Sequence, residues 1–98
     1  MNNEKLIYKL CDFYKMISDF TRMKILNELL ERPLTLSTIS KKINVSKIVV
    51  KNELELLINK NIVVKEKDAR IISYRISNSY ISKVIKTGIK EFSKYEKV

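Results

Sequence analysis

Hydrophobic residues recur every three or four positions along most of this sequence, and that spacing predicts helices. The pattern is clear over about residues 3–17 and again over about 20–31, where it stops before Pro33. Ser18 and Asp19, between the two stretches, are suitable helix caps. We therefore expect the chain to begin with two consecutive helices, the first of which has a broad apolar face.

The middle of the chain predicts two further helices separated by a tight turn. Residues 34–36 are too few for a helix and indicate a short strand, after which Ser37 can cap a helix that runs to Ile43. Asn44 tolerates a left-handed backbone, so the chain can turn there into a fourth helix over about 46–59. Two helices joined in this way form a helix-turn-helix. The residues of the fourth helix expected to face the core are Val50, Leu54 and Leu57.

Two β-rich runs follow, over residues 62–64 and 70–76, on either side of a polar turn at 65–69. This arrangement predicts a hairpin. A hairpin directly after a helix-turn-helix is a wing. The predicted fold is therefore mainly α with a small β-hairpin wing (α+β), a winged helix-turn-helix that occupies residues 1–98 as a single domain.

The last predicted helix, over about residues 78–96 with a cap at Ser77 or Asn78, carries an apolar seam at heptad-like spacing. A domain of this size has little left with which to cover both this seam and the apolar face of the first helix. The plainest way to bury both is against a second copy, so we expect a homodimer formed by the two terminal helices. The residues expected at its interface are Leu6, Leu10, Cys11, Phe13, Ile81, Ile85, Gly88, Phe92 and Tyr95.

Basic residues outnumber acidic ones by 20 to 11, which gives a net charge of +9 in only 98 residues. An excess this large indicates a polyanionic partner, with nucleic acid as the first candidate. A membrane surface is less favoured because the basic residues are spread along the whole chain and do not form one cluster. The alternative is that the lysines serve only solubility.

Other features exclude several classes of function. No apolar run reaches the ~18 residues of a membrane span, and the first residues lack the apolar region of a secretory signal, so we expect a cytoplasmic protein with no membrane partner. Cys11 is the only cysteine and there is no histidine, which excludes an intrachain disulfide and histidine-dependent chemistry. A glycine-rich phosphate loop and a paired-carboxylate pattern are also missing. We therefore expect neither an enzyme nor a bound cofactor.

Three motifs resemble the ArsR-type family of winged-helix repressors, and the resemblance covers about residues 10–85. Residues 18–26 (Ser-Asp-Phe-Thr-Arg-Met-Lys-Ile-Leu) are similar to the family's Ala-Asp-Pro-Thr-Arg-Leu-Arg-Ile-Leu, and residues 34–40 to its Leu-Ser-Val-Ser-Glu-Leu-Ala. Residues 68–70 and 73–76 resemble the Glu-Gly-Arg and Tyr-Tyr-Arg-Leu of its wing. The resemblance implies a repressor of transcription that binds double-stranded DNA, with the fourth helix in the major groove and the wing on the adjacent minor groove or backbone.

The sequence departs from the family at positions that bind metals. Metal-sensing members carry cysteines where this chain has Thr35 and Ser37, and others carry an Asp and His pattern on the last helix that is absent here. The resemblance thus implies a member without a metal site. Ala69 replaces the family's wing glycine, and Phe20 replaces the proline at the start of the second helix.

The expected DNA contacts lie on the fourth helix, the third helix and the wing at about 65–70. Lys47 and Lys51, one turn apart, suit phosphates, whereas Asn52 either reads an adenine edge or is a solvated helix residue. The expected contacts from the fourth helix are Ser46, Lys47, Ile48, Val49, Lys51 and Asn52. Those from the third helix and the wing are Lys41, Lys42, Lys65, Lys67 and Arg70.

Several of these residues leave alternatives open. Ile48 and Val49 suit thymine methyl groups, but they can equally belong to the core or to a protein contact. In the last case the chain is a protein-interaction module without specific DNA binding. RNA binding through the same basic surface is a weaker third possibility. Glu53 either accepts a hydrogen bond from a cytosine amino group or weakens binding, and Cys11 is either a small apolar residue or a thiol near the dimer axis.

Overall fold

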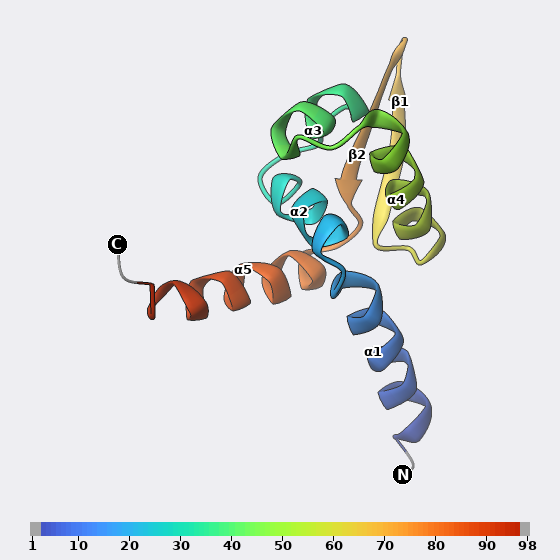
Figure 1. Ribbon diagram of the computed structural model, residues 1–98. Helices are drawn as coiled ribbons and strands as arrows, with labels where there is room; N and C mark the ends of the chain where they lie inside the picture. The colour runs from blue at the N-terminus through green and yellow to red at the C-terminus, as the bar shows by residue number, and fades with distance from the viewer. Residues whose placement is uncertain (1–2, 97–98) are drawn as a thin grey trace.

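The computed structural model describes residues 3–96, so the first two and last two residues of the predicted domain 1–98 lie outside the described part. The chain folds into helices and one antiparallel hairpin in the predicted order (Figure 1). The elements are α1 (Glu4–Ile17), α2 (Phe20–Glu28), α3 (Leu36–Ile43), α4 (Lys47–Asn59), β1 (Val63–Asp68), β2 (Ile71–Ile76) and α5 (Ser79–Ser93).

Short polar side chains fix where most of the helices begin. The Asp19 carboxylate accepts a hydrogen bond from the Arg22 backbone N–H at 3.0 Å, the Ser46 hydroxyl accepts one from Val49 at 3.3 Å, and Asn78 caps α5 in the same way. These three caps confirm positions predicted from the sequence. Ser18 instead closes the end of α1.

The predicted strand at residues 34–36 is reduced to one bridge, and the predicted cap at Ser37 is wrong. Leu34 exchanges two backbone hydrogen bonds with Tyr74, of 3.0 and 2.8 Å. The next residue, Thr35, already caps α3, because its hydroxyl accepts a hydrogen bond from the Thr38 N–H at 3.2 Å. Thr35 itself is still extended, but Leu36 is the first residue of α3 and its backbone is helical, so pairing cannot continue.

α2 ends at Glu28, three residues before the predicted end. The Leu29 N–H is shared between the carbonyls of Ile25 and Leu26, which tightens the last turn. The chain then crosses to Leu34, where it joins the hairpin. α2 therefore ends in a tightened turn well before Pro33.

The first strand of the hairpin is longer than predicted. Lys65, Lys67 and Asp68 belong to β1, where Asp68 pairs with Ile71, and only Ala69 and Arg70 form the turn. The expected turn at 65–69 was therefore wrong except at its last residue. The charged residues of this segment led to the prediction of a loop. Both faces of this part of the hairpin are exposed, so a strand can carry polar residues on both sides here.

α2, α3 and α4 pack around a single apolar core that the base of the hairpin completes. The inward-facing residues of α4 are the three predicted ones, and each is fully buried. Helical spacing therefore fixed the orientation of α4 about its axis. The buried core residues include Ile25, Leu26, Ile39, Val50, Leu54, Leu57, Val63 and Tyr74.

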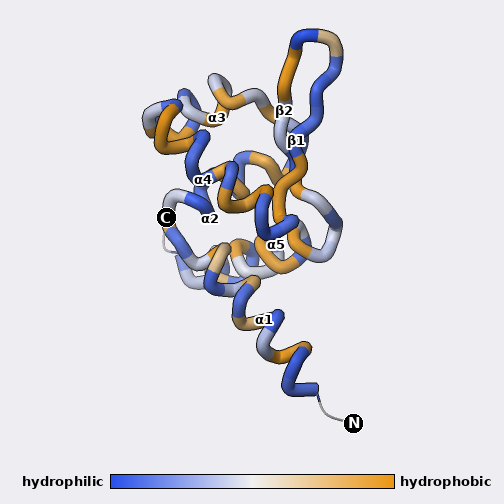
Figure 2. Tube along the Cα trace, turned by 90° about the vertical axis from the view of Figure 1, so that its right-hand side faces the viewer, coloured by the Kyte–Doolittle hydropathy of each residue, from blue (hydrophilic) through white to orange (hydrophobic). Residues whose placement is uncertain are grey.

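α1 and α5 leave this core in different directions, like two arms (Figure 1). Viewed from the side, α1 runs away from the body with apolar positions along its length, and the hairpin points the opposite way (Figure 2). Ile81 and Ile85 were expected at a dimer interface, but each is only 4% exposed within one chain. This part of the predicted seam is therefore corrected: the first half of α5 belongs to the monomer core.

Two leucines on α4 provide a matched test of this packing. Leu54 is fully buried, whereas Leu56, on the other side of the same helix, is 45% exposed. We expect Leu54→Ala to lower the free energy of unfolding by about 2–5 kcal/mol, because it removes buried methyl groups and leaves a cavity. Leu56→Ala should cost no more than about 1 kcal/mol. Urea unfolding followed by circular dichroism measures both, and equal costs would contradict the described packing.

Candidate nucleic-acid interface

The turn between α3 and α4 is held by local hydrogen bonds. Asn44 ends α3 with a left-handed backbone, φ 55°, as its position predicted. The Ser40 hydroxyl donates to the Val45 carbonyl at 2.6 Å, and the Val45 N–H donates to the Ser40 carbonyl at 3.2 Å. α4 therefore starts at a defined angle to α3, and its first turn lies on the side of the body from which the hairpin projects (Figure 1).

All six residues predicted for the contact surface of α4 are solvent-exposed. Ile48 is 76% and Val49 43% exposed, whereas their neighbour Val50 is buried in the core. The structure thus excludes the core as the place of Ile48 and Val49. Both remain free to contact a partner, as do Ser46, Lys47, Lys51 and Asn52.

The first turn of α4 is suited to an anion. The N–H groups at the start of a helix have no partner in the preceding turn, and the helix dipole places partial positive charge there. Ser46 uses its hydroxyl oxygen as the cap of Val49 and can still donate its own hydrogen. Lys47 and Lys51 add two full positive charges on the same exposed side. A phosphate fits this arrangement.

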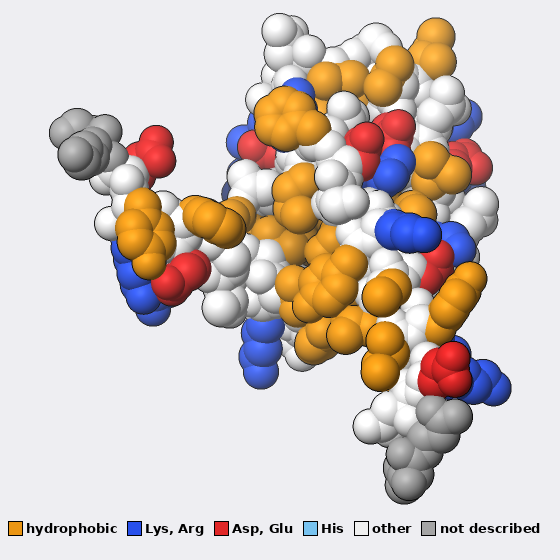
Figure 3. Space-filling view, turned by 60° about the horizontal axis from the view of Figure 1, so that its bottom comes forward, with side chains coloured by type: hydrophobic (Ala, Val, Ile, Leu, Met, Phe, Trp, Pro, Cys, Tyr) orange, Lys and Arg blue, Asp and Glu red, His pale blue; other side chains and the backbone are white. Residues whose placement is uncertain are grey.

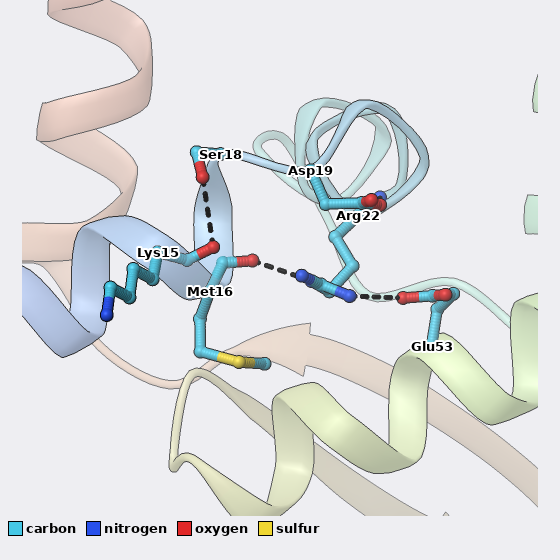
Figure 4. A network of polar contacts seen from close by, with 6 residues as sticks. All are labelled: Lys15, Met16, Ser18, Asp19, Arg22 and Glu53. Carbon is cyan, nitrogen blue, oxygen red and sulfur yellow. Dashed lines mark hydrogen bonds and ion pairs between the residues drawn. The ribbon is translucent and has the colours of Figure 1, made fainter.

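Glu53 does not share this surface. Its carboxylate turns away and forms an ion pair of 2.9 Å with Nη1 of Arg22, and the two side chains are only 22% and 18% exposed (Figure 4). This corrects the expectation that Glu53 faces the DNA, either to read a cytosine or to weaken binding. Arg22 was not singled out from the sequence, since no spacing rule connects residues 31 positions apart.

β1 places its two lysines and its two acidic residues on opposite faces of the hairpin. Alternate residues of a strand point to opposite sides, so Lys65 and Lys67 share the side of Val63, which packs into the core. Glu66 and Asp68 therefore point to the other side, where Glu66 forms an ion pair with Arg75. The lysines of β1 face the same side as the body and α4.

The remaining predicted basic contacts are exposed as well. Lys41 and Lys42 lie in the last turn of α3, and Arg70 lies at the turn of the hairpin. The sequence did not single out Ile71 and Ile72, which follow Arg70 and are exposed near the tip. An alternating strand pattern would have marked one of them as exposed, but two adjacent isoleucines hide that signal.

Tyr74 connects the hairpin electrostatically to α4. Burial raises the pKa of its hydroxyl, the positive charge of Lys51 lowers it, and the negative charge of Glu55 raises it. Tyr74 is therefore neutral at physiological pH. It also pairs with Leu34, so one buried residue ties α4, the hairpin and the chain before α3 together.

The apolar residues predicted for a dimer interface divide into two groups. Ile81 and Ile85 are in the core, whereas Leu6, Leu10, Cys11, Phe92 and Tyr95 are exposed and Phe13 is half-buried against Tyr80. Apolar side chains gather on the face where α1 and α5 leave the body (Figure 3).

A groove of about 520 Å³ lies on α5 beside α2. It is lined by Met23 of α2 and by Val84, Gly88, Ile89 and Phe92 of α5. A Cβ atom added at Gly88 would meet nothing within 4 Å, so this predicted interface residue has open space before it. The groove and the exposed apolar residues of the two terminal helices are candidates for a protein contact.

Within residues 3–96, no three His, Cys, Asp or Glu side chains come together in a way that could hold a metal ion. The helices in that part of the chain are also too short or too polar to cross a membrane.

Together these elements define a winged helix-turn-helix fold, as the sequence predicted. Solved structures of transcriptional regulators share it. HlyU from Vibrio cholerae, in its reduced form, superposes with a TM-score of 0.80 at 24% identity, covering 86% of this chain and 88% of HlyU. The transcriptional repressor BigR from Xylella fastidiosa gives 0.82 at 19% identity, over 97% of this chain and 94% of BigR.

A third similar structure is the homodimeric winged helix-turn-helix DNA-binding domain Mb0332 from Mycobacterium bovis, described as a possible ArsR-family regulator. Its TM-score is 0.81 at 14% identity, with 100% of this chain and 94% of that one covered. At such identities the likeness establishes the fold alone. No protein-family model matches the sequence, and no curated protein matches it either.

The turn of the wing offers a test of local strain. Ala69 has φ 56°, a conformation that favours glycine, and it stands where the resembling family has glycine. We expect Ala69→Gly to raise the free energy of unfolding by about 0.5–1 kcal/mol, measured by urea unfolding. At another left-handed position, Asn61→Ala should lower the free energy of unfolding, because asparagine tolerates φ 59° better than alanine does. A loss of stability in Ala69→Gly would contradict this backbone geometry.

Proposed function

We propose that this chain is a cytoplasmic, homodimeric repressor of transcription in the ArsR-type family, which binds specific sites in double-stranded DNA and has no metal site, cofactor or enzymatic activity. The observation that carries the proposal is the exposed, positively charged first half of α4 beside a wing whose lysines face the same side. In this arrangement one helix fits a major groove while the wing follows the adjacent backbone.

Different residues of α4 contact the phosphates and the bases. Lys47 and Lys51 contact phosphates, which requires charge and reach but no fine placement. Asn52 forms a bidentate contact with adenine, and the exposed Ile48 and Val49 pack on thymine methyl groups. Lys41 and Lys42 of α3, together with Lys65, Lys67 and Arg70 of the wing, contact the flanking backbone or minor groove.

Two kinds of observation support the proposed family and the proposed role as a repressor. Three sequence motifs resemble ArsR-type repressors, and BigR, a transcriptional repressor, and Mb0332, a possible ArsR-family regulator, share the fold. A dimer places two recognition helices about one DNA turn apart, which matches a palindromic site. Binding to such a site in a promoter blocks transcription.

The dimer is formed by α1 and by the second half of α5. Leu6, Leu10, Phe92 and Tyr95 are large, apolar and exposed, and together they exceed the scattered exposure that is normal for a monomer. The groove next to Gly88 offers space for side chains of the second copy. Mb0332, which shares the fold, is homodimeric.

DNA binding is tested with two variants of equal charge. In Lys47→Ala/Lys51→Ala, binding to all duplexes should weaken, and the slope of log affinity against log salt should flatten by about 0.9 for each phosphate that is no longer neutralised. The control, Lys5→Ala/Lys9→Ala, removes the same charge from exposed positions on α1 and should change little. Fluorescence anisotropy with duplexes selected from a random pool measures both. Equal weakening in the two variants would leave only a general charge effect.

The dimer is tested with two phenylalanines that are equally exposed. Phe92 on α5 and Phe20 at the start of α2 are both 76% exposed. We expect the wild-type chain to sediment with twice the mass of one chain. Phe92→Ser should shift it toward the monomer at micromolar concentration, while Phe20→Ser stays dimeric. A wild type that remains monomeric at high micromolar concentration would refute the dimer and the palindromic site with it.

A second candidate is a protein-interaction module, and the exposed Ile48 and Ile71 favour it. These apolar residues lie near the first turn of α4 and near the wing tip, where a purely phosphate-binding surface needs none. In that case duplex binding at low salt is undetectable or does not depend on salt, and the anisotropy titration above separates the two functions.

A further inference from the structure

Arg22 lies at the centre of a small network where α1, α2 and α4 meet (Figure 4). Its Nε donates to the Met16 carbonyl at 2.7 Å, and its Nη1 donates to the Glu53 carboxylate at 2.9 Å. Its backbone N–H donates to Asp19, the cap of α2. One side chain thus connects the end of α1 with the middle of α4 through its two kinds of guanidinium nitrogen.

The two ends of this connection differ in what they provide. Met16 lies in the last turn of α1, where helix carbonyls have no partner in the helix, so Arg22 caps α1. Ser18 supports the same corner by donating to the Lys15 carbonyl at 3.0 Å. Glu53, in contrast, lies within α4, between the exposed Asn52 and the buried Leu54.

Apolar packing and the Arg22–Glu53 pair hold α4 in different ways. Hydrophobic contacts are non-directional, so burial decides which face of α4 points inward but provides no directional bond at the border of that face. A charge-assisted hydrogen bond from a planar guanidinium is directional. The Arg22–Glu53 pair lies at the border of the core and only one residue from Asn52, so it provides such a bond close to the surface proposed to read DNA.

We propose that Arg22 is a positioning residue, which through Glu53 holds α4 at a fixed angle to the end of α1 and so sets the geometry in which α4 meets DNA. This rests on the proposed function. We call the Arg22–Glu53 pair, together with the bond from Arg22 to Met16, the clamp. Since α1 is also the proposed dimer helix, the clamp fixes each recognition helix relative to the dimer axis. The spacing of the two half-sites depends on that relation.

The decisive test uses the sign of a charge effect. Glu53→Met and Glu55→Met each remove one negative charge from α4, and general electrostatics predicts tighter DNA binding for both. Glu55 is exposed, and no ion pair within residues 3–96 holds it to another element. We therefore expect Glu55→Met to bind duplex as tightly as the wild type or more tightly. Glu53→Met should bind roughly tenfold more weakly, because it removes the charge-assisted hydrogen bond to Arg22.

Three further measurements separate positioning from simple loss of stability. Affinities are compared at a temperature at which circular dichroism shows each variant to be folded. Arg22→Lys keeps the charge but cannot hold both partners in the same plane, so it should lie between wild type and Arg22→Met. The double variant Arg22→Met/Glu53→Met should cost no more affinity than Arg22→Met alone, because the two residues act through one hydrogen bond.

The outcomes are distinct. If Glu53→Met binds duplex as tightly as Glu55→Met, or if the double variant loses the sum of both single losses, the clamp is overturned while the proposed function stands. If the wild-type chain binds no duplex, the proposed function is overturned. The clamp is then decided by amide hydrogen exchange in α4, which needs no DNA. Faster exchange in Glu53→Met than in Glu55→Met supports it, and equal exchange overturns it.

Discussion

The burial of one face of α4 is the constraint on which the rest of the structure depends. Val50, Leu54 and Leu57 have no exposed surface, and each fills space between α2, α3 and the hairpin. Helix geometry fixes the direction of all remaining side chains of α4 relative to these three. Their burial therefore decides that Ile48 faces solvent. The same constraint directs Glu53 to the border between core and surface, where Arg22 meets it. The candidate interface is thus a consequence of core packing.

The basic character of that interface arises from where the acidic side chains go as much as from where the lysines are. Glu53 is neutralised by Arg22, and Glu66 pairs with Arg75 on the outer face of the hairpin. The strand alternation that sends Glu66 outward also turns Lys65 toward the side of the body. A helix and a hairpin that each contain both signs of charge therefore present mainly positive charge on one side.

The terminal helices show a different balance. α5 begins inside the core with Ile81 and continues beyond the edge of the body, where Phe92 is exposed on the same apolar stripe. α1 shares almost none of its apolar surface with the core, apart from residues near its end such as Ile17. A chain of this size cannot wrap both helices around one small core. The exposed apolar stripes of the two helices are the observation that supports the proposed homodimer.

Periodicity and capping chemistry determined the order of the elements, the inward face of α4 and the left-handed turn at Asn44, because these depend on residues close together in the chain. They also identified the exposed lysines of the candidate site. Tertiary structure alone decided that Ile81 is buried in the core and that Glu53 forms an ion pair with Arg22. Those outcomes depend on which distant segments meet, and local spacing carries no information about a contact between residues 31 positions apart.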